Sequence, residues 1–205
     1  MTAPIFISCL ALLFTVGSFY WIQVRKGRLK LFPVITFSGY WKKSRLVLRL
    51  PVVLFNSGAR PRVITALRLT TTDNDGETII LECHSFRRTV DPTADDMEDM
   101  AHAYAIPARQ VVTKHAHFAV DSLPVFYQPG PTPFQVQALV DASTNWRKLG
   151  DVAVHVEIMH TPSYITYSNN PGVWPASLQD DAARYRARIF GTDALPLDAP
   201  GKPVH

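Results

Sequence analysis

The chain has 205 residues, a formal net charge of +4 and two cysteines, Cys9 and Cys83. Two cysteines exclude a framework of several disulfides. The modest charge, with no recognition-helix motif and no glycine-flanked aromatic sheet motif, argues against a nucleic-acid partner. Once an apolar N-terminal stretch is set aside, the remaining residues suffice for one domain with its own core.

An uncharged apolar run extends from Pro4 to Val24. At about 1.5 Å per residue, a helix of this length matches the roughly 30 Å hydrocarbon core of a bilayer. Phe19, Tyr20 and Trp21 stand at its end, where aromatic rings prefer the headgroup layer. We therefore predict that residues 1–24 form an uncleaved transmembrane anchor. The alternatives are a buried core helix and a cleaved signal peptide, although no basic residue precedes the run and no clean cleavage site follows.

Four basic residues follow the apolar run: Arg25, Lys26, Arg28 and Lys30. Lysine and arginine concentrate on the cytoplasmic side of membrane helices. This asymmetry therefore favours the cytoplasm over the periplasm for the rest of the chain. Residues 25–30 are predicted to be a basic juxtamembrane linker whose side chains reach the headgroups of the lipid bilayer.

Seven later segments alternate apolar and polar residues, which is typical of half-buried strands. Arg45–Phe55 is the clearest, because apolar side chains take every even position from Leu46 to Leu54. In 63–71, the pattern places Val63, Thr65, Leu67 and Leu69 on one face. The predicted fold is mainly β: an antiparallel immunoglobulin-like or fibronectin-like β-sandwich over residues 31–160. The seven segments are 29–37, 45–55, 63–71, 78–86, 110–120, 134–140 and 152–158.

Two further segments lack the strand pattern. Asp91–Met100 is acidic and is expected to form a loop or a short helix. Residues 161–191 are expected to hold a loop and one C-terminal amphipathic helix that ends at a Gly191 cap. That helix packs on the β domain, lies at the membrane surface or binds a partner. Residues 192–205 are expected to be a disordered tail. The apolar stripe of the helix consists of Leu178, Ala182, Tyr185 and Ile189.

His115 and His117 form the strongest candidate for chemistry. Their side chains share one face of a predicted strand, opposite Phe118, and could hold a metal ion together. A third ligand could come from other histidines, but the sequence does not bring one near. Cys83 alternates with apolar residues and is interpreted as part of the core. No phosphate-binding glycine loop, nucleophile elbow or zinc-protease motif occurs, so we expect neither catalysis nor a cofactor.

The segment Leu50–Leu69 reads LPVVLFNSGARPRVITALRL. Its Asn-x-Gly-x-Arg-Pro turn, from Asn56 to Pro61, resembles that of a group of uncharacterised bacterial single-pass membrane proteins. These carry an N-terminal helix, a basic linker and an immunoglobulin-like β-sandwich. The resemblance covers residues 4–160. It implies the same architecture and a bacterial inner-membrane location, and it implies no activity or site residues.

Together these observations predict a membrane-anchored β-sandwich interaction module with no catalytic activity. Its partner is expected to be another protein, whose identity and the oligomeric state the sequence leaves open. Two alternatives remain: a metal-binding domain that uses His115 and His117, and a small accessory subunit of a membrane complex.

Overall fold

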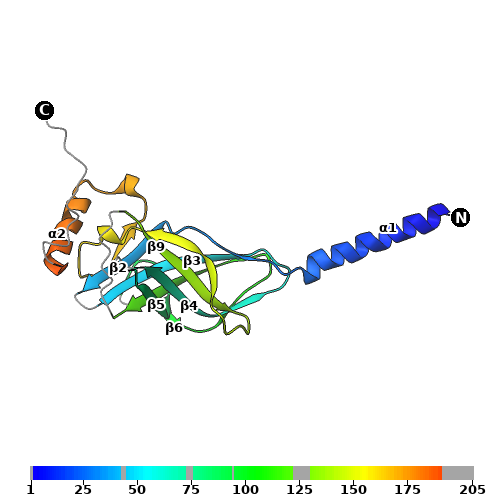
Figure 1. Cartoon of the computed structure of the whole chain (residues 1–205), viewed down its shortest axis with the longest axis horizontal. Coiled ribbons are helices and arrows are strands. Elements are labelled where there is room, and N and C mark those ends of the chain that lie inside the picture. The colour runs from blue at the N-terminus through cyan, green and yellow to red at the C-terminus, as the bar shows by residue number, and fades with distance from the viewer. Residues whose placement is uncertain (1, 43–44, 73–75, 94, 122–129, 191–205) are drawn as a thin grey trace, which may run out of the picture.

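The computed structural model describes residues 2–42, 45–72, 76–93, 95–121 and 130–190. The predicted cap Gly191 and the predicted tail 192–205 lie outside these ranges. Helix α1 (Thr2–Phe19) continues into a π-helical segment (Tyr20–Val24). Figure 1 shows α1 projecting from one end of a curled β domain, with α2 (Leu178–Phe190) at the opposite end.

The described strands form one continuous antiparallel sheet in the order β10-β9-β4-β5-β8-β3-β2-β11. Three short strands lie off this path: β1 pairs with β3, β6 with β5 and β7 with β4. The mainly β, antiparallel prediction is confirmed. The immunoglobulin-like sandwich is not, because the described strands curl as one half-barrel. The strands are β1 (Leu29–Leu31), β2 (Thr36–Lys42), β3 (Arg45–Asn56), β4 (Arg62–Thr72), β5 (Thr78–Arg87), β6 (Met97–Met100), β7 (Tyr104–Ile106), β8 (Val111–Val120), β9 (Thr132–Val140), β10 (Arg147–Val154) and β11 (Ile165–Ser168).

The core lies on one face of this sheet. The alternation predicted for Arg45–Phe55 is confirmed, since Leu46, Leu48, Leu50, Val52 and Leu54 are all buried. They pack with core side chains from the neighbouring strands, such as Phe118 of β8. The stripe of α2 also packs here: Ala182 and Tyr185 are buried, and the Tyr185 hydroxyl donates to the Trp41 carbonyl at 2.6 Å. The C-terminal helix therefore packs against the end of the β domain near β2.

Two predicted strands differ in the structure, each for a local reason. The strand predicted over 29–37 is two strands, because Pro33 lies between them and has no N–H to donate to the ladder. The strand predicted over 152–158 ends at Val154. There the Asn169 side chain donates to the Ala153 carbonyl at 2.7 Å and accepts from the His155 N–H at 2.9 Å. A 3₁₀ turn (Val156–Ile158) follows.

Two other predictions need correction. Asp91–Met100 is not a loop or helix throughout, because its last four residues form β6 along β5. In β4, Val63 and Thr65 are exposed while Ile64, Leu67 and Leu69 are buried. A register shift between Ile64 and Ala66 moves the alternation to the other face. The sheet also extends beyond residue 160, through β11 paired with β2.

Candidate functional site

The apolar N-terminal helix is exposed along its length. Among the described residues, one helix, Ala3–Val24, is long and apolar enough to cross a membrane. Phe14 in its middle is 76% exposed, although a soluble fold would bury such a side chain. The predicted interface aromatics Phe19, Tyr20 and Trp21 lie at its inner end and are more than half exposed. The helix therefore does not pack against the core of the β domain.

The linker (residues 25–30) is hydrogen-bonded to the domain. The Ala59 N–H donates to the Arg25 carbonyl at 3.0 Å, and the Ser57 N–H donates to the Arg28 carbonyl at 3.1 Å. The Arg28 N–H in turn donates to the Ser57 hydroxyl at 2.9 Å. Lys30 already belongs to β1, paired with Phe55. The predicted linker is therefore a fixed segment that lies along the Asn-x-Gly-x-Arg-Pro turn.

Two glycines make this contact possible. A Cβ built on Gly58 would lie 2.4 Å from the Gly27 nitrogen, and one on Gly27 would lie 1.8 Å from the Gly58 nitrogen. Both are backbone atoms that cannot rotate away. The linker and the turn can therefore approach this closely only when both positions lack a side chain.

Asn56 holds the turn in place beneath the linker. It is fully buried, and its side-chain oxygen accepts from the Gly58 N–H at 2.9 Å. Its side-chain nitrogen donates to the carbonyls of Arg60 at 2.8 Å and Ile106 at 3.2 Å. The asparagine and the glycine of the motif thus have a shared physical role, which is to shape the surface on which the linker lies.

A further contact fixes the end of the helix itself. Arg109 follows β7 with a positive φ of 58°, and its guanidinium donates to the Trp21 carbonyl at 3.0 Å. The Arg25 guanidinium lies 3.9 Å from the centre of the Trp21 ring. The apolar helix and the β domain are thereby joined in a defined orientation, with the predicted interface residues at the junction.

A second polar site, here called the buried cluster, lies on the opposite face of the sheet from the core. It comprises Arg49, Asp96, Arg87, His117 and Tyr164. The Arg49 side chain is 2% exposed and forms an ion pair with Asp96. Its other bonds run to the Tyr164 hydroxyl at 2.9 Å and to two backbone carbonyls at 3.0 and 3.1 Å. These bonds fasten the segment after β5 and the segment before β11 onto the sheet.

The surroundings of the buried cluster favour an ionised Asp96 and a neutral His117. Burial opposes ionisation of Asp96, but the hydrogen bonds from Arg49 and from the Thr93 N–H, together with the charges of Arg49 and Arg87, outweigh it and lower the pKa of that carboxyl. Burial lowers the pKa of His117 to about 4, and the nearby charges of Arg87 and Arg49 act in the same direction. The imidazole is therefore neutral at neutral pH.

The two histidines predicted to bind metal lie on the same strand face, as expected from their spacing. His117 pairs with Arg49 across the β3–β8 ladder, and its Nδ1 lies 3.4 Å from the Tyr164 hydroxyl. Within the described residues, no group of three His, Cys, Asp or Glu side chains is placed to hold a metal ion. The guanidiniums beside His117 also oppose a dication. Metal binding by His115 and His117 remains a prediction.

Cys83, interpreted from the sequence as a core residue, is half-buried and packs against the core. Burial raises the pKa of its thiol to about 12, so the reactive thiolate is absent at neutral pH.

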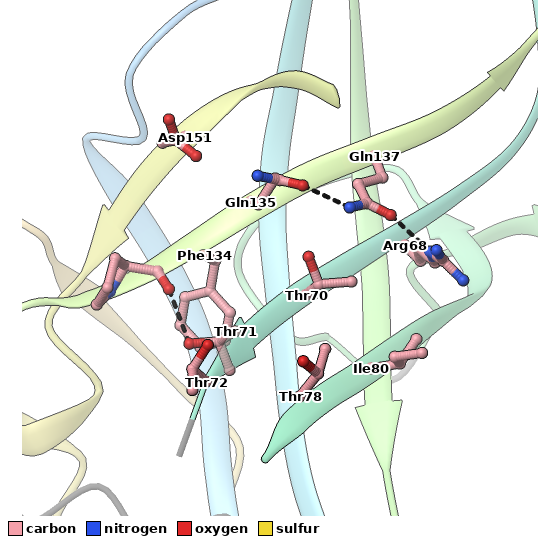
Figure 2. Close-up of a pocket in the computed structure, with 11 residues that line it drawn as sticks. Arg68, Thr70, Thr71, Thr72, Thr78, Ile80, Phe134, Gln135, Gln137 and Asp151 are labelled. Atoms are coloured by element: carbon pink, nitrogen blue, oxygen red, sulfur yellow. Dashed lines mark hydrogen bonds between the residues drawn. The ribbon is translucent and has the colours of Figure 1, made fainter. Parts of the chain in front are cut away.

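A third polar site, here called the polar groove, is shallow and has a volume of about 470 Å³. Figure 2 shows its side chains on adjacent strands, with Arg68 donating to Gln137 at 2.9 Å and Gln137 donating to Gln135. Thr70 pairs with Gln135 across the β4–β9 ladder. The groove thus presents hydroxyls and amides on the sheet face that points away from the core. Other lining residues are Thr72, Thr78, Ile80 and Asp151.

No protein-family model and no curated protein matches the chain. Among solved structures, it is similar to a structural-genomics X-ray structure of target SoR45, with 9% identity, a TM-score of 0.34, and coverage of 72% of this chain and 89% of that one. It is also similar to the Pseudomonas fluorescens alkylpurine DNA glycosylase AlkC bound to DNA containing an abasic-site analogue. That match has 11% identity and a TM-score of 0.33, and it covers 62% of this chain and 30% of the glycosylase.

Proposed function

We propose that the chain is a single-pass, membrane-anchored interaction module without catalytic activity, and that it presents its polar groove to a protein partner. The observation that carries this proposal is the fixed junction between helix and domain. A flexible tether would leave the domain free to rotate, whereas this linker is bonded along its length to the turn after β3. Such a junction suits a protein that must offer one surface at a set angle to the membrane.

The polar groove supports a role in binding more than one in catalysis. Its hydroxyl and amide groups can donate and accept hydrogen bonds, as a peptide backbone requires. The Arg68 guanidinium lies 4.1 Å from the centre of the Trp146 ring, and such arginine–aromatic pairs are common at protein interfaces. The groove contains no arrangement of a nucleophile with an adjacent base among its described lining residues.

The decisive experiment is site-specific photo-crosslinking in native membranes with the full chain. A photoreactive residue at Thr78, in the groove, should give one discrete protein adduct. The same residue at Val173, which is 62% exposed and outside the groove, should not. The R68A/Q137A pair should abolish the Thr78 adduct. Equal adducts from both positions would contradict the groove as the binding surface. Turnover of a substrate that a point substitution abolishes would contradict the non-catalytic assignment.

The same proposal places the anchor in a bacterial inner membrane with the domain on the cytoplasmic side. The basic residues after the helix support this orientation. Cysteine-accessibility labelling of a T78C variant from each side of the membrane tests it. Retention of the intact N-terminus in carbonate-washed membranes distinguishes an anchor from a cleaved signal peptide. A mature chain that begins after residue 18 would exclude the anchor.

A further inference from the structure

A cavity of about 340 Å³, here called the basic cavity, lies at the foot of the apolar helix. Four cations and one carboxylate line it: Lys26, Arg60, Arg62, Arg147 and Asp141. They come from the linker, the turn after β3, the start of β4, the connection after β9 and the start of β10. Segments far apart in sequence thus bring several positive charges to one concave surface. Lys26 stands two residues beyond the candidate membrane span.

Most of these cations have no protein counter-charge. The side chains of Lys26, Arg60 and Arg147 make no ion pair or hydrogen bond with any residue that the structure describes. Like charges brought together around a concave surface repel one another, and a bound anion relieves that repulsion. All three side chains are exposed, so their charges are available to an anion that enters the cavity.

The remaining pair is held in a set position. Asp141 has a positive φ of 60°, and its carboxylate accepts from the Val63 N–H at 3.1 Å and from the Arg62 Nε at 2.8 Å. The Arg62 Nη1 also donates to the Gly27 carbonyl at 3.3 Å. Asp141 accordingly orients one guanidinium at the cavity wall and leaves its third nitrogen available. A planar guanidinium held in this way suits the oxygens of a phosphate group.

We propose that the basic cavity binds the phosphate of an anionic phospholipid headgroup. This inference rests on the proposed membrane anchoring, which brings the cavity to the headgroup layer. The bound phosphate, with its single negative charge, lies between Arg60 and Arg147 and reduces their mutual repulsion. It thereby holds this end of the β domain on the bilayer. The fixed linker and Gly27, which lines the cavity, keep the site directly beside the end of the helix.

Native mass spectrometry of the full chain in a neutral detergent tests the proposal, with phosphatidylglycerol and phosphatidylcholine of matched acyl chains at equal concentration. We expect one retained phosphatidylglycerol, with a preference over phosphatidylcholine of about ten-fold. R60Q/R147Q should remove that preference. The control R184Q/R188Q removes the same charge from α2, at the opposite end of the molecule, and should keep it. Equal retention of both lipids, or loss of the preference in both variants, would overturn the proposal.

Inorganic phosphate provides the second arm of the test. Because the site is proposed to take a lipid phosphate, millimolar inorganic phosphate should not displace phosphatidylglycerol. Displacement would assign the cavity to a soluble phosphate compound and overturn the lipid assignment. Membrane fractionation separates this result from failure of the anchor: R60Q/R147Q should stay in carbonate-washed membranes. A wild-type chain in the soluble fraction would contradict the anchoring itself.

Discussion

The buried cluster and the basic cavity are both rich in arginine, yet they satisfy their charges in opposite ways. In the buried cluster, Arg49 has a carboxylate, a tyrosine hydroxyl and two carbonyls as partners. In the basic cavity, Arg60 and Arg147 have no partner among the described residues. A saturated charge network holds protein segments together, whereas an unsaturated one retains the capacity to bind something else. The buried cluster, whose charges are paired, is therefore the structural site, and the basic cavity, whose arginines are unpaired among the described residues, is the candidate for ligand binding.

The largest effect is expected from removing the carboxylate of the buried cluster. D96A leaves the Arg49 guanidinium buried without its counter-charge, and we expect a loss of about 3–5 kcal/mol in the free energy of unfolding. Denaturant unfolding measures it. The control is D121A, which breaks an exposed pair with Arg45 and should cost less than about 1 kcal/mol. Similar losses in the two variants would mean that the buried cluster does not stabilise the fold.

A smaller effect is expected at the glycine contact, which forms part of the wall of the basic cavity. G58A places a Cβ against the Gly27 backbone, and we expect a loss of about 1–3 kcal/mol from the displaced linker. Amide hydrogen exchange should then accelerate at Ala59 and Ser57, whose N–H groups bond to the linker. In the control G17A, a Cβ meets nothing within 4 Å, and exchange at these amides should not change. Unchanged exchange in G58A would show that the linker is not fixed by this contact.

The pH dependence of stability gives a further test of the buried cluster, through His117. Burial lowers the pKa of His117 from 6.5 to about 4, so the folded state prefers the neutral imidazole. Its contribution to stability is thus fully present above the unfolded pKa and is lost as the pH falls through the interval down to about 4. Between about pH 7 and about pH 4, wild type should lose about 1–2 kcal/mol more than H117Q, after allowance for partial exposure. Both proteins keep Asp96, whose lowered pKa acts in the same direction, so the difference isolates His117. Parallel pH profiles would contradict the burial of this imidazole.

The sequence predicts those parts of the fold that depend on local alternation and misses those that depend on long-range contacts. The even positions of β3 are buried, and the apolar stripe of α2 is buried or partly buried, as their periodicity indicates. The face of β4 is predicted wrongly from Val63 to Thr65, because a bulge shifts the alternation by one residue and alternation alone cannot locate a bulge. Likewise, Arg49 stands on the polar side of β3, and only the segments that cover that side make it buried.

The candidate sites also divide into those that local sequence can predict and those that depend on long-range contacts. A membrane-interface role for the aromatic and basic residues after the apolar run can be predicted because they are contiguous in the sequence, and it stays a prediction. The basic cavity could not, because Lys26, Arg62 and Arg147 meet only through the pairing of β4 with β9 and β9 with β10. One signal was available for the junction: the glycine of the Asn-x-Gly-x-Arg-Pro turn. Its partner Gly27 lies in the linker, and no sequence pattern connects the two.

The smallest effect on stability is expected from the arginines of the basic cavity, and it tests the comparison most directly. Because Arg60 and Arg147 have no partner among the described residues, R60Q/R147Q should change the free energy of unfolding by less than about 0.5 kcal/mol. The measurement is denaturant unfolding in a neutral detergent without added lipid. Added phosphatidylglycerol should then stabilise wild type and leave the double variant unchanged, because only a ligand of the folded state shifts its equilibrium. A large loss of stability without lipid would mean that these arginines, like Arg49, are structural.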